Sequence, residues 1–130
     1  MTTLYTKGAA STEYDKLIYD ITIDRRVKGV SLASGQGVLA KGTVLGIVTL
    51  TGVAKVVDST KEDGTETADC VLTDAVDTGT TDPVPAEAYS SGSFNRQALI
   101  FGGTDTADLH ETILRGKGIF LSDKIPYPQV

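Results

Sequence analysis

The stretch Ser31–Leu50, SLASGQGVLAKGTVLGIVTL, combines apolar β-forming residues with glycines at short intervals. Two parts of it, Ser34–Gly37 and Lys41–Gly42, predict tight turns, because glycine reaches positive φ angles at no steric cost. The residues between and after these turns are mostly Val, Leu and Ile. The stretch therefore predicts a turn-rich β structure, and it contains no concentration of catalytic residue types.

The same composition continues from Thr43 to Val57, which is dense in Val, Ile, Leu and Thr. Gly46 and Gly52 interrupt this run, so we expect a strand, a bulge or tight bend, and a second strand. We interpret the glycines as scaffold residues that set the turns of a rigid β framework: Gly35, Gly37, Gly42 and Gly46.

Upstream of this stretch, apolar and polar side chains alternate from Leu17 to Ile23, with Ile18 as the exception. A period of two over this length predicts a half-buried strand. The preceding residues, 1–16, are rich in Thr, Ser, Gly and Ala and carry few side chains that could anchor a core. We therefore expect an N-terminal arm, although an ordinary frayed terminus fits the composition as well.

The tip of this arm has good β-propensity. Such a segment is suited to adding a strand to the sheet of a partner. The candidate partner-binding residues are Thr2, Thr3, Leu4, Tyr5, Thr6 and Lys7.

Acidic residues gather between Asp58 and Asp82, where Lys61 is the single basic residue. No register matches the EF-hand calcium loop, because the required glycine and the oxygen ligands never fall into place together. An irregular calcium site or a glycan-binding surface remains an alternative. The simpler interpretation is a solvated loop, 58–64, that closes a hairpin through Asp63-Gly64.

Further strands are expected downstream. Residues 84–89 are expected to form a short edge strand, since Pro83 and Pro85 disfavour a helix and favour an extended path. We further expect a turn at 90–92, a buried strand at 98–101, and the last strand at 118–121. A proline-stiffened tail follows at 125–128.

The chain has one convincing helix signal, from Asp105 to Arg115. Thr104 or Asp105 can cap its first turn, and Gly116 is placed as the C′ glycine. Leu109 and Ile113 are four residues apart and predict the buried face. His110, the single histidine, borders that face.

Composition excludes several classes of function. With 130 residues a single domain is expected, and the net charge of −5 argues against binding to nucleic acid. The small basic cluster Arg25, Arg26 and Lys28 does not change that balance. No apolar run is long enough to span a membrane, and no secretory signal is recognisable. The lone Cys70 precedes Val71-Leu72 and reads as a small buried hydrophobe.

No catalytic or cofactor motif is present. The sequence lacks a nucleophile elbow, a Walker loop and metal-ligand spacing, and Gly35-x-Gly37 does not fit a dinucleotide fingerprint. We therefore expect no catalytic residues, no cofactor and no metal, and predict a binding or structural module instead of an enzyme.

An ordered series of segments resembles the head decoration proteins of tailed bacteriophages, the lambda head protein D type. It spans about Leu17 to Leu121 and consists of Val30–Leu39, Lys41–Gly46, Asp63–Ala68 followed by Val71-Leu72, Gly92-x-Phe94-Asn95, and Leu114–Ile119.

The resemblance implies a homotrimer on the outer surface of the expanded phage head, at three-fold and quasi-three-fold sites, that stabilises the shell against DNA pressure. It implies the major capsid protein as partner, synthesis in the host cytoplasm, and an N-terminal arm that orders on the capsid. The expected fold is α+β and β-rich, with a compact mixed β core over 17–130, one principal helix at about 105–115, and a flexible arm over 1–16.

Overall fold

The computed structural model describes residues 17–18 and 24–122 of the chain. The predicted arm, most of the predicted strand at 17–23 and the proline tail lie outside the described residues. Among the residues described, strands predominate and α1 (Ala107–Gly116) is the one α-helix. The prediction of a β-rich α+β fold with one principal helix is confirmed.

Five strands close into a small barrel. Going round it, each strand pairs with the next, and the last pairs with the first. The barrel strands in that order are β2 (Arg26–Leu32), β5 (Ala54–Val56), β4 (Val44–Ile47), β6 (Cys70–Leu72) and β8 (Val84–Asn95). Closure satisfies the backbone groups that an open sheet would leave unpaired at its edges.

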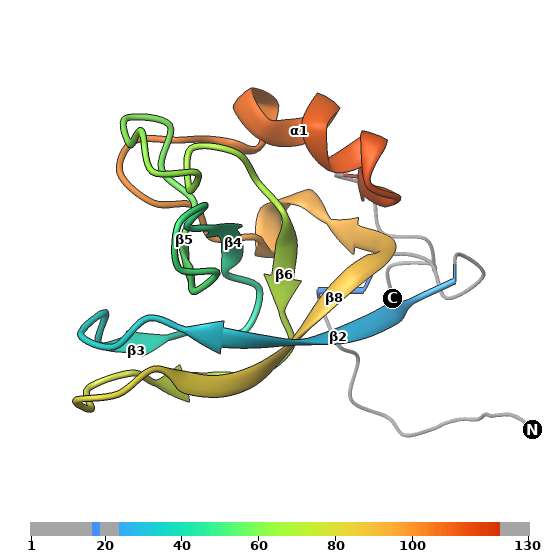
Figure 1. Cartoon of the computed structure of the whole chain (residues 1–130). Helices are drawn as coiled ribbons and strands as arrows, with labels where there is room; N and C mark the ends of the chain where they lie inside the picture. Colours follow the sequence, from blue (N-terminus) through green and yellow to red (C-terminus); the bar gives the residue numbers. More distant parts are fainter. Residues whose placement is uncertain (1–16, 19–23, 123–130) are drawn as a thin grey trace, which may run out of the picture.

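Two further pairings extend the barrel. β9 (Ile119–Ser122) lies parallel to the second half of β8, and β3 (Val38–Leu39) pairs antiparallel with β7 (Val76–Asp77). In Figure 1, α1 lies at the top of the view and β2 and β3 at the bottom, and β8 runs upward from there toward the helix.

The core consists of two apolar clusters, and the period-two geometry of the strands divides neighbouring residues between them. Val44 belongs to the first cluster and Leu45 to the second, although both are in β4. In β6, Val71 faces the first cluster, and Cys70 and Leu72 face the second. Leu114 of α1 closes the first cluster and is fully buried.

The predicted turns are confirmed at both ends of the short strand β3. Gly35, Gly37 and Gly42 have φ angles of 83°, 75° and 91°. Gly52, with φ of 79°, makes the turn between β4 and β5 as expected.

Gly46 is the exception, because it lies inside β4 and makes no turn. A Cβ atom at Gly46 would come within 2.7 Å of the Thr65 Cα and 2.8 Å of the Thr65 carbonyl oxygen. Gly46 is needed there because a neighbouring loop passes directly over the strand and leaves no room for a side chain. The requirement for glycine comes from packing and not from the backbone conformation.

The predicted hairpin through Asp63-Gly64 is wrong. β5 and β6 lie on opposite sides of β4, so the residues between them cross over β4. The crossing loop is held by the Thr49 N–H, which donates to the Asp63 carbonyl at 2.8 Å. Gly64 still takes a positive φ of 108°, but it packs against β4 instead of joining two paired strands.

The predicted edge strand at 84–89 and turn at 90–92 are also wrong. β8 runs unbroken for 12 residues and is the most connected strand, with β2, β6 and β9 as neighbours. Gly92 has φ of 143°, and β8 changes partner at this residue, from β2 and β6 before it to β9 after it. The glycine that predicted a turn therefore marks the point where β8 changes its partner strand.

Residues 98–101 do not form the predicted buried strand. A 3₁₀ turn, Arg96–Ala98, is favoured by Asn95, whose side-chain oxygen accepts from the Gln97 N–H at 3.1 Å. Leu99 is buried, whereas Ile100 is 43% exposed and makes only an isolated bridge to Thr43. The apolar run is therefore divided between core and surface.

The predicted helix is confirmed, but it begins at Ala107 and its N-cap, Thr106, makes no side-chain capping bond. The predicted buried face is wrong. Leu109 and Ile113 are 55% and 45% exposed, whereas His110 and Leu114 are buried. The pairs Leu109/Ile113 and His110/Leu114 have the same four-residue spacing and lie side by side on this helix. Only packing against the rest of the fold decides which pair is buried.

At the end of α1, Gly116 is the last helical residue, and the positive φ angle falls on Gly118 at 88°. β9 follows and confirms the strand predicted at 118–121. Within the described ranges, no helix has the length and apolar character to cross a bilayer.

Candidate capsid-binding region

The root of the predicted arm is fixed on β8. Ile18 forms an antiparallel bridge with Phe94, and the Asn95 N–H donates to the Leu17 carbonyl at 2.7 Å. The Leu17 side chain is 3% exposed and belongs to the same core cluster as Phe94. The chain therefore enters the core at a defined point, the C-terminal end of β8. The predicted contact residues, Thr2–Lys7, lie outside the described part.

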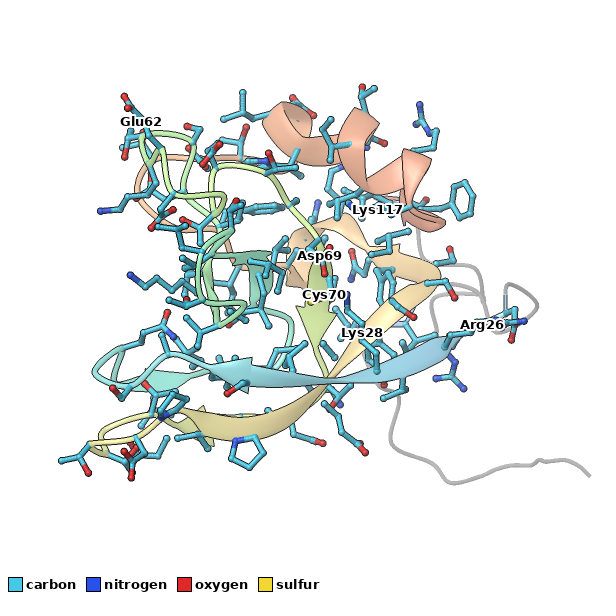
Figure 2. All side chains as sticks on the ribbon, in the orientation of Figure 1. Arg26, Lys28, Glu62, Asp69, Cys70 and Lys117 are labelled. Carbon is cyan, nitrogen blue, oxygen red and sulfur yellow. The ribbon has the colours of Figure 1, made fainter. Side chains whose placement is uncertain are left out.

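One carboxylate joins three elements of the core. Asp69 Oδ2 lies 2.5 Å from Lys28 Nζ of β2, and Asp69 Oδ1 lies 3.5 Å from Lys117 Nζ at the end of α1. Figure 2 shows Asp69 between these two lysines, with Cys70 beside it. The ion pairs tie β2, the start of β6 and the end of the helix together.

These contacts determine which protonation states are favoured. Burial alone would raise the pKa of Asp69, but the hydrogen bond and charge of Lys28 outweigh it, so the pKa is lowered. Burial would lower the pKa of Lys28, and the hydrogen bond from its ammonium group to Asp69 reverses this, so that pKa is raised. Both groups are thus held in their charged forms. Arg26 pairs instead with Asp24 at the exposed surface, at 2.9 Å.

The acidic region uses its carboxylates to hold its own turns. Asp58 accepts from the Thr60 hydroxyl at 2.7 Å, and Asp63 accepts from the Thr65 hydroxyl at 2.6 Å. These hydrogen bonds, together with those from the backbone N–H groups of Thr60 and Thr65, lower the pKa of both carboxylates. Within residues 17–18 and 24–122, no three His, Cys, Asp or Glu side chains gather in a way that could hold a metal ion. Nothing in the geometry therefore favours the calcium alternative.

His110 lies in a buried polar junction. Its ring stacks on Phe101 with centroids 5.5 Å apart, and its Nε2 lies 2.8 Å from Asp105 Oδ2. Ser59 donates from its hydroxyl to Asp105 Oδ1 at 2.6 Å. A catalytic relay would need the serine next to the imidazole, but here the carboxylate lies between them. The arrangement is that of a structural junction.

The two other candidates from the sequence, the Cys70 thiol and the Gly35 turn, also have structural roles. Cys70 is fully buried, and burial followed by the charge of Asp69 raises the pKa of its thiol to about 12. At the Gly35 turn the backbone donors are used, since Gly35 N–H donates to the Thr78 carbonyl at 2.7 Å and Gln36 N–H to the Thr78 hydroxyl at 2.9 Å. No phosphate cradle remains there.

Exposed apolar side chains are the feature that the sequence analysis missed. Leu109 and Ile113 of α1 are accompanied by Phe120 of β9, which is 40% exposed, and Leu50 at the tip of the β4–β5 turn is 95% exposed. The one signal for this in the sequence is that Leu109 and Ile113 lie beside Leu114 on the helix, because apolar residues on two sides of a helix indicate that both sides are covered.

The family model described as bacteriophage lambda head decoration protein D matches residues 6–118. The chain belongs to this family. The match covers the whole barrel, α1 and residues 6–16 of the predicted arm, which include Thr6 and Lys7. A search of curated proteins returns no match.

The decoration protein is therefore a structural protein of the phage head, located on the capsid surface of the virion and without enzymatic activity. This agrees with a described core in which the histidine, the cysteine and the loop carboxylates Asp58 and Asp63 are engaged in folding. Its partner is the capsid itself. The resemblance stated from the sequence is thereby confirmed.

Proposed function

We propose that the decoration protein acts as a homotrimer at three-fold and quasi-three-fold positions of the expanded head. Each subunit holds the major capsid protein with its N-terminal arm, residues 1–16, and residues 17–130 form a single core. The trimer links neighbouring capsid subunits and so resists the pressure of packaged DNA. Binding free energy alone performs this work, and no covalent step is needed.

The anchored root at Leu17 is the observation that carries the proposal. A tether transmits force only if its inner end is fixed, and here a buried side chain and a hydrogen bond to Asn95 fix it. A 16-residue segment reaches roughly 50 Å when extended. That length is sufficient to cross from one capsid subunit to its neighbour.

Strand addition is the mode of binding that the arm's composition favours. The β-prone segment Thr2–Lys7 would pair with the edge of a capsid sheet, where backbone hydrogen bonds supply affinity and alternate side chains supply specificity. Ordering such a segment costs a few kcal/mol, so a single arm binds weakly. Three arms on one trimer act together and can raise the overall affinity by about 10² to 10⁴-fold.

The trimer needs contact surfaces that a ring can use. A closed ring of three joins two different patches on each subunit, since head-to-tail contacts are heterologous. Exposed apolar side chains occur on separate elements of the described core, Leu109 and Ile113 on α1 and Leu50 on the β4–β5 turn. They support subunit contacts because apolar surface of this kind is stabilised by burial.

Two measurements test the proposal. Sedimentation of the full chain should give the mass of a trimer, and deletion of residues 1–10 should leave the protein trimeric, with a mass lower only by the deleted residues and with an unchanged melting temperature. The deleted protein should no longer decorate expanded heads. A chain in which the first ten residues are kept but Leu4 and Tyr5 are changed to Ser should bind at least tenfold more weakly. Equal binding by the deleted and full chains would contradict the arm proposal, and a monomeric mass would contradict the trimer.

A further inference from the structure

Cationic side chains gather around the end of α1 in excess of the carboxylates that pair with them. Asp69 lies between the ammonium groups of Lys28 and Lys117, so one negative charge serves two positive charges. Lys117 is held more loosely, at 3.5 Å, and 40% of its side chain is exposed. Arg115 is 60% exposed and shares its partner Glu111 with a second arginine. The charge of Lys117 is therefore only partly neutralised within the subunit.

Exposed apolar side chains adjoin these cations. Leu109, Ile113 and the C-cap residue Lys117 follow one another at intervals of four residues, so they share one side of the helix. Phe120 follows on β9, which packs on α1, and is 40% exposed. An apolar centre with a charged rim is typical of protein–protein contacts. We call this the helix-end surface, made of Ile113, Arg115, Lys117 and Phe120.

The crossing loop between β5 and β6 has the opposite charge. Its residues 58–66 contain four carboxylates and one lysine. Lys55 of β5 offsets them only in part, because its Nζ is 4.0 Å from Asp63 Oδ2 and both side chains are well exposed. Hydrogen bonds from Thr65 lower the pKa of Asp63, so this carboxylate is charged at neutral pH. Glu62 beside it is exposed.

Leu50 places an apolar side chain beside this loop. It is 95% exposed, and the N–H of its neighbour Thr49 donates to the Asp63 carbonyl at 2.8 Å. We call Leu50, Glu62 and Asp63 the loop surface. The loop surface and the helix-end surface are both apolar and charged, and their charges are opposite.

The two surfaces lie apart on the subunit. Figure 2 shows Glu62 at the upper left of the view, and Lys117 well to the right of it. A ring of three joins two different surfaces on each subunit, because its contacts are head-to-tail. Opposite charges favour such a contact, whereas two copies of the same surface would repel each other.

We propose that the loop surface of each subunit contacts the helix-end surface of the next subunit in the trimer. Leu50 then packs on Ile113 and Phe120, and Glu62 faces Lys117. The occupant of each surface is a second copy of this chain. The proposal rests on the proposed function, since it takes the protein to be a trimer. Salt should weaken the contact, because the charges lie at its exposed rim.

The test measures trimer dissociation by sedimentation velocity over a dilution series. It compares the full chain with Glu62→Lys, Lys117→Glu, the double variant that carries both, and Asp82→Lys. Each of the first two variants puts like charges opposite each other and should raise the concentration at which the trimer dissociates by about tenfold or more. The double variant restores opposite charges and should return to within about threefold of the full chain. Asp82→Lys, the same charge change at an exposed loop position, should stay within about twofold.

Circular dichroism checks that each variant folds. If Lys117→Glu does not fold because its carboxylate lies beside Asp69, Arg115→Glu replaces it, alone and combined with Glu62→Lys. Single variants that leave the trimer unchanged overturn the proposal, as does a loss that the double variant does not restore. Trimers that persist but decorate heads more weakly would assign these surfaces to the capsid and also overturn it. A full chain that is monomeric at every concentration contradicts the proposed trimer itself, which is a distinct result.

Discussion

The imidazole Nε2 of His110 lies 2.8 Å from Asp105 Oδ2, and only 4% and 2% of the two side chains are exposed. The carboxylate also accepts from the N–H and the hydroxyl of Ser59, at 2.7 and 2.6 Å. An ionised carboxylate can only accept, so Nε2 carries the proton in this pair. One buried group therefore connects the crossing loop, the approach to α1 and the helix itself.

Replacing Asp105 with Ala should destabilise the fold by about 1–3 kcal/mol, because it leaves the buried ring of His110 without its acceptor, whereas the donors of the exposed Ser59 can turn to water. Urea denaturation measures the change. Asp108→Ala is the matched control, since that side chain is 90% exposed and pairs with Arg96 at the surface. The control should lose less than about 1 kcal/mol. Similar losses of unfolding free energy in both variants would show that the buried junction at Asp105 adds no more stability than an exposed ion pair.

Stability should decrease as the pH falls below about 4. Burial would raise the pKa of Asp105, but hydrogen bonds from Ser59 and His110 outweigh it, so its pKa in the folded protein is lowered. At acidic pH the unfolded chain therefore binds more protons than the folded chain, and acid favours unfolding. This contribution is present above the unfolded pKa and is lost as the pH falls through the folded pKa.

Melting temperatures between pH 7 and pH 2 measure this dependence. Asp105→Asn should flatten the acid limb of the curve, and Asp82→Asn, at an exposed loop position, should not. A curve for Asp105→Asn that is parallel to that of the unmodified protein at every pH would contradict the assignment.

Gly46→Ala should destabilise the protein by about 1–3 kcal/mol or prevent folding, because its Cβ would overlap the Thr65 backbone at 2.7 Å. Gly29→Ala in β2 is the control, since no atom lies within 4 Å of a Cβ there. Alanine loses less conformational entropy than glycine in a strand, so this control should be neutral or stabilising by up to about 1 kcal/mol. Equal effects of the two substitutions in thermal melts would exclude the close contact as the reason for Gly46.

Cys70 should not react with a thiol reagent at pH 8 while the protein is folded. Its side chain is fully buried, and its pKa of about 12 keeps the thiol protonated. Colour development with a disulfide reagent should appear only on adding denaturant, and then at one thiol per chain. Rapid labelling of the native protein would mean that β6 opens easily or that the thiol is accessible.

Ile113→Glu should dissociate the proposed trimer without unfolding the subunit, because a charge would lie in the middle of the apolar face of α1. Sedimentation velocity gives the mass, and circular dichroism confirms the fold. Val38→Glu is the matched control, since Val38 is 69% exposed and lies on β3. A trimer that survives Ile113→Glu but is lost in Val38→Glu would place the subunit contact at β3 instead of α1.

Local chemistry made several parts of this fold predictable. Gly35, Gly37 and Gly42 identify their turns because few other residues tolerate positive φ, and the last strand follows from its apolar run. The helix, predicted at 105–115 and found at 107–116, follows from its capping residues, the spacing of its apolar residues and the glycine at its end. The root of the arm could be approached from the alternation that begins at Leu17. None of these inferences needs a distant residue.

Other features depend on contacts between residues that are far apart in the chain. Lys28 and Asp69 are separated by 41 positions, and nothing in either segment indicates that they will meet. Leu109 and Ile113 have the same spacing as His110 and Leu114. His110 is buried against Asp105 and Phe101, which provide a polar partner and a stacking surface for the imidazole, and Leu114 is buried in the first core cluster.

The sequence by itself determined the turns at Gly35, Gly37, Gly42 and Gly52, the β-rich class of the fold, where the one described helix forms, and to which family the chain belongs, because these depend on local preferences and on residue order. The tertiary structure decided which strands are neighbours, why Gly46 must be glycine, which helix face is exposed, and that Leu17 and Ser122 both lie beside Asn95. Those outcomes depend on contacts between segments far apart in the chain, since the neighbours of a strand and the buried face of a helix are chosen by packing across the whole fold.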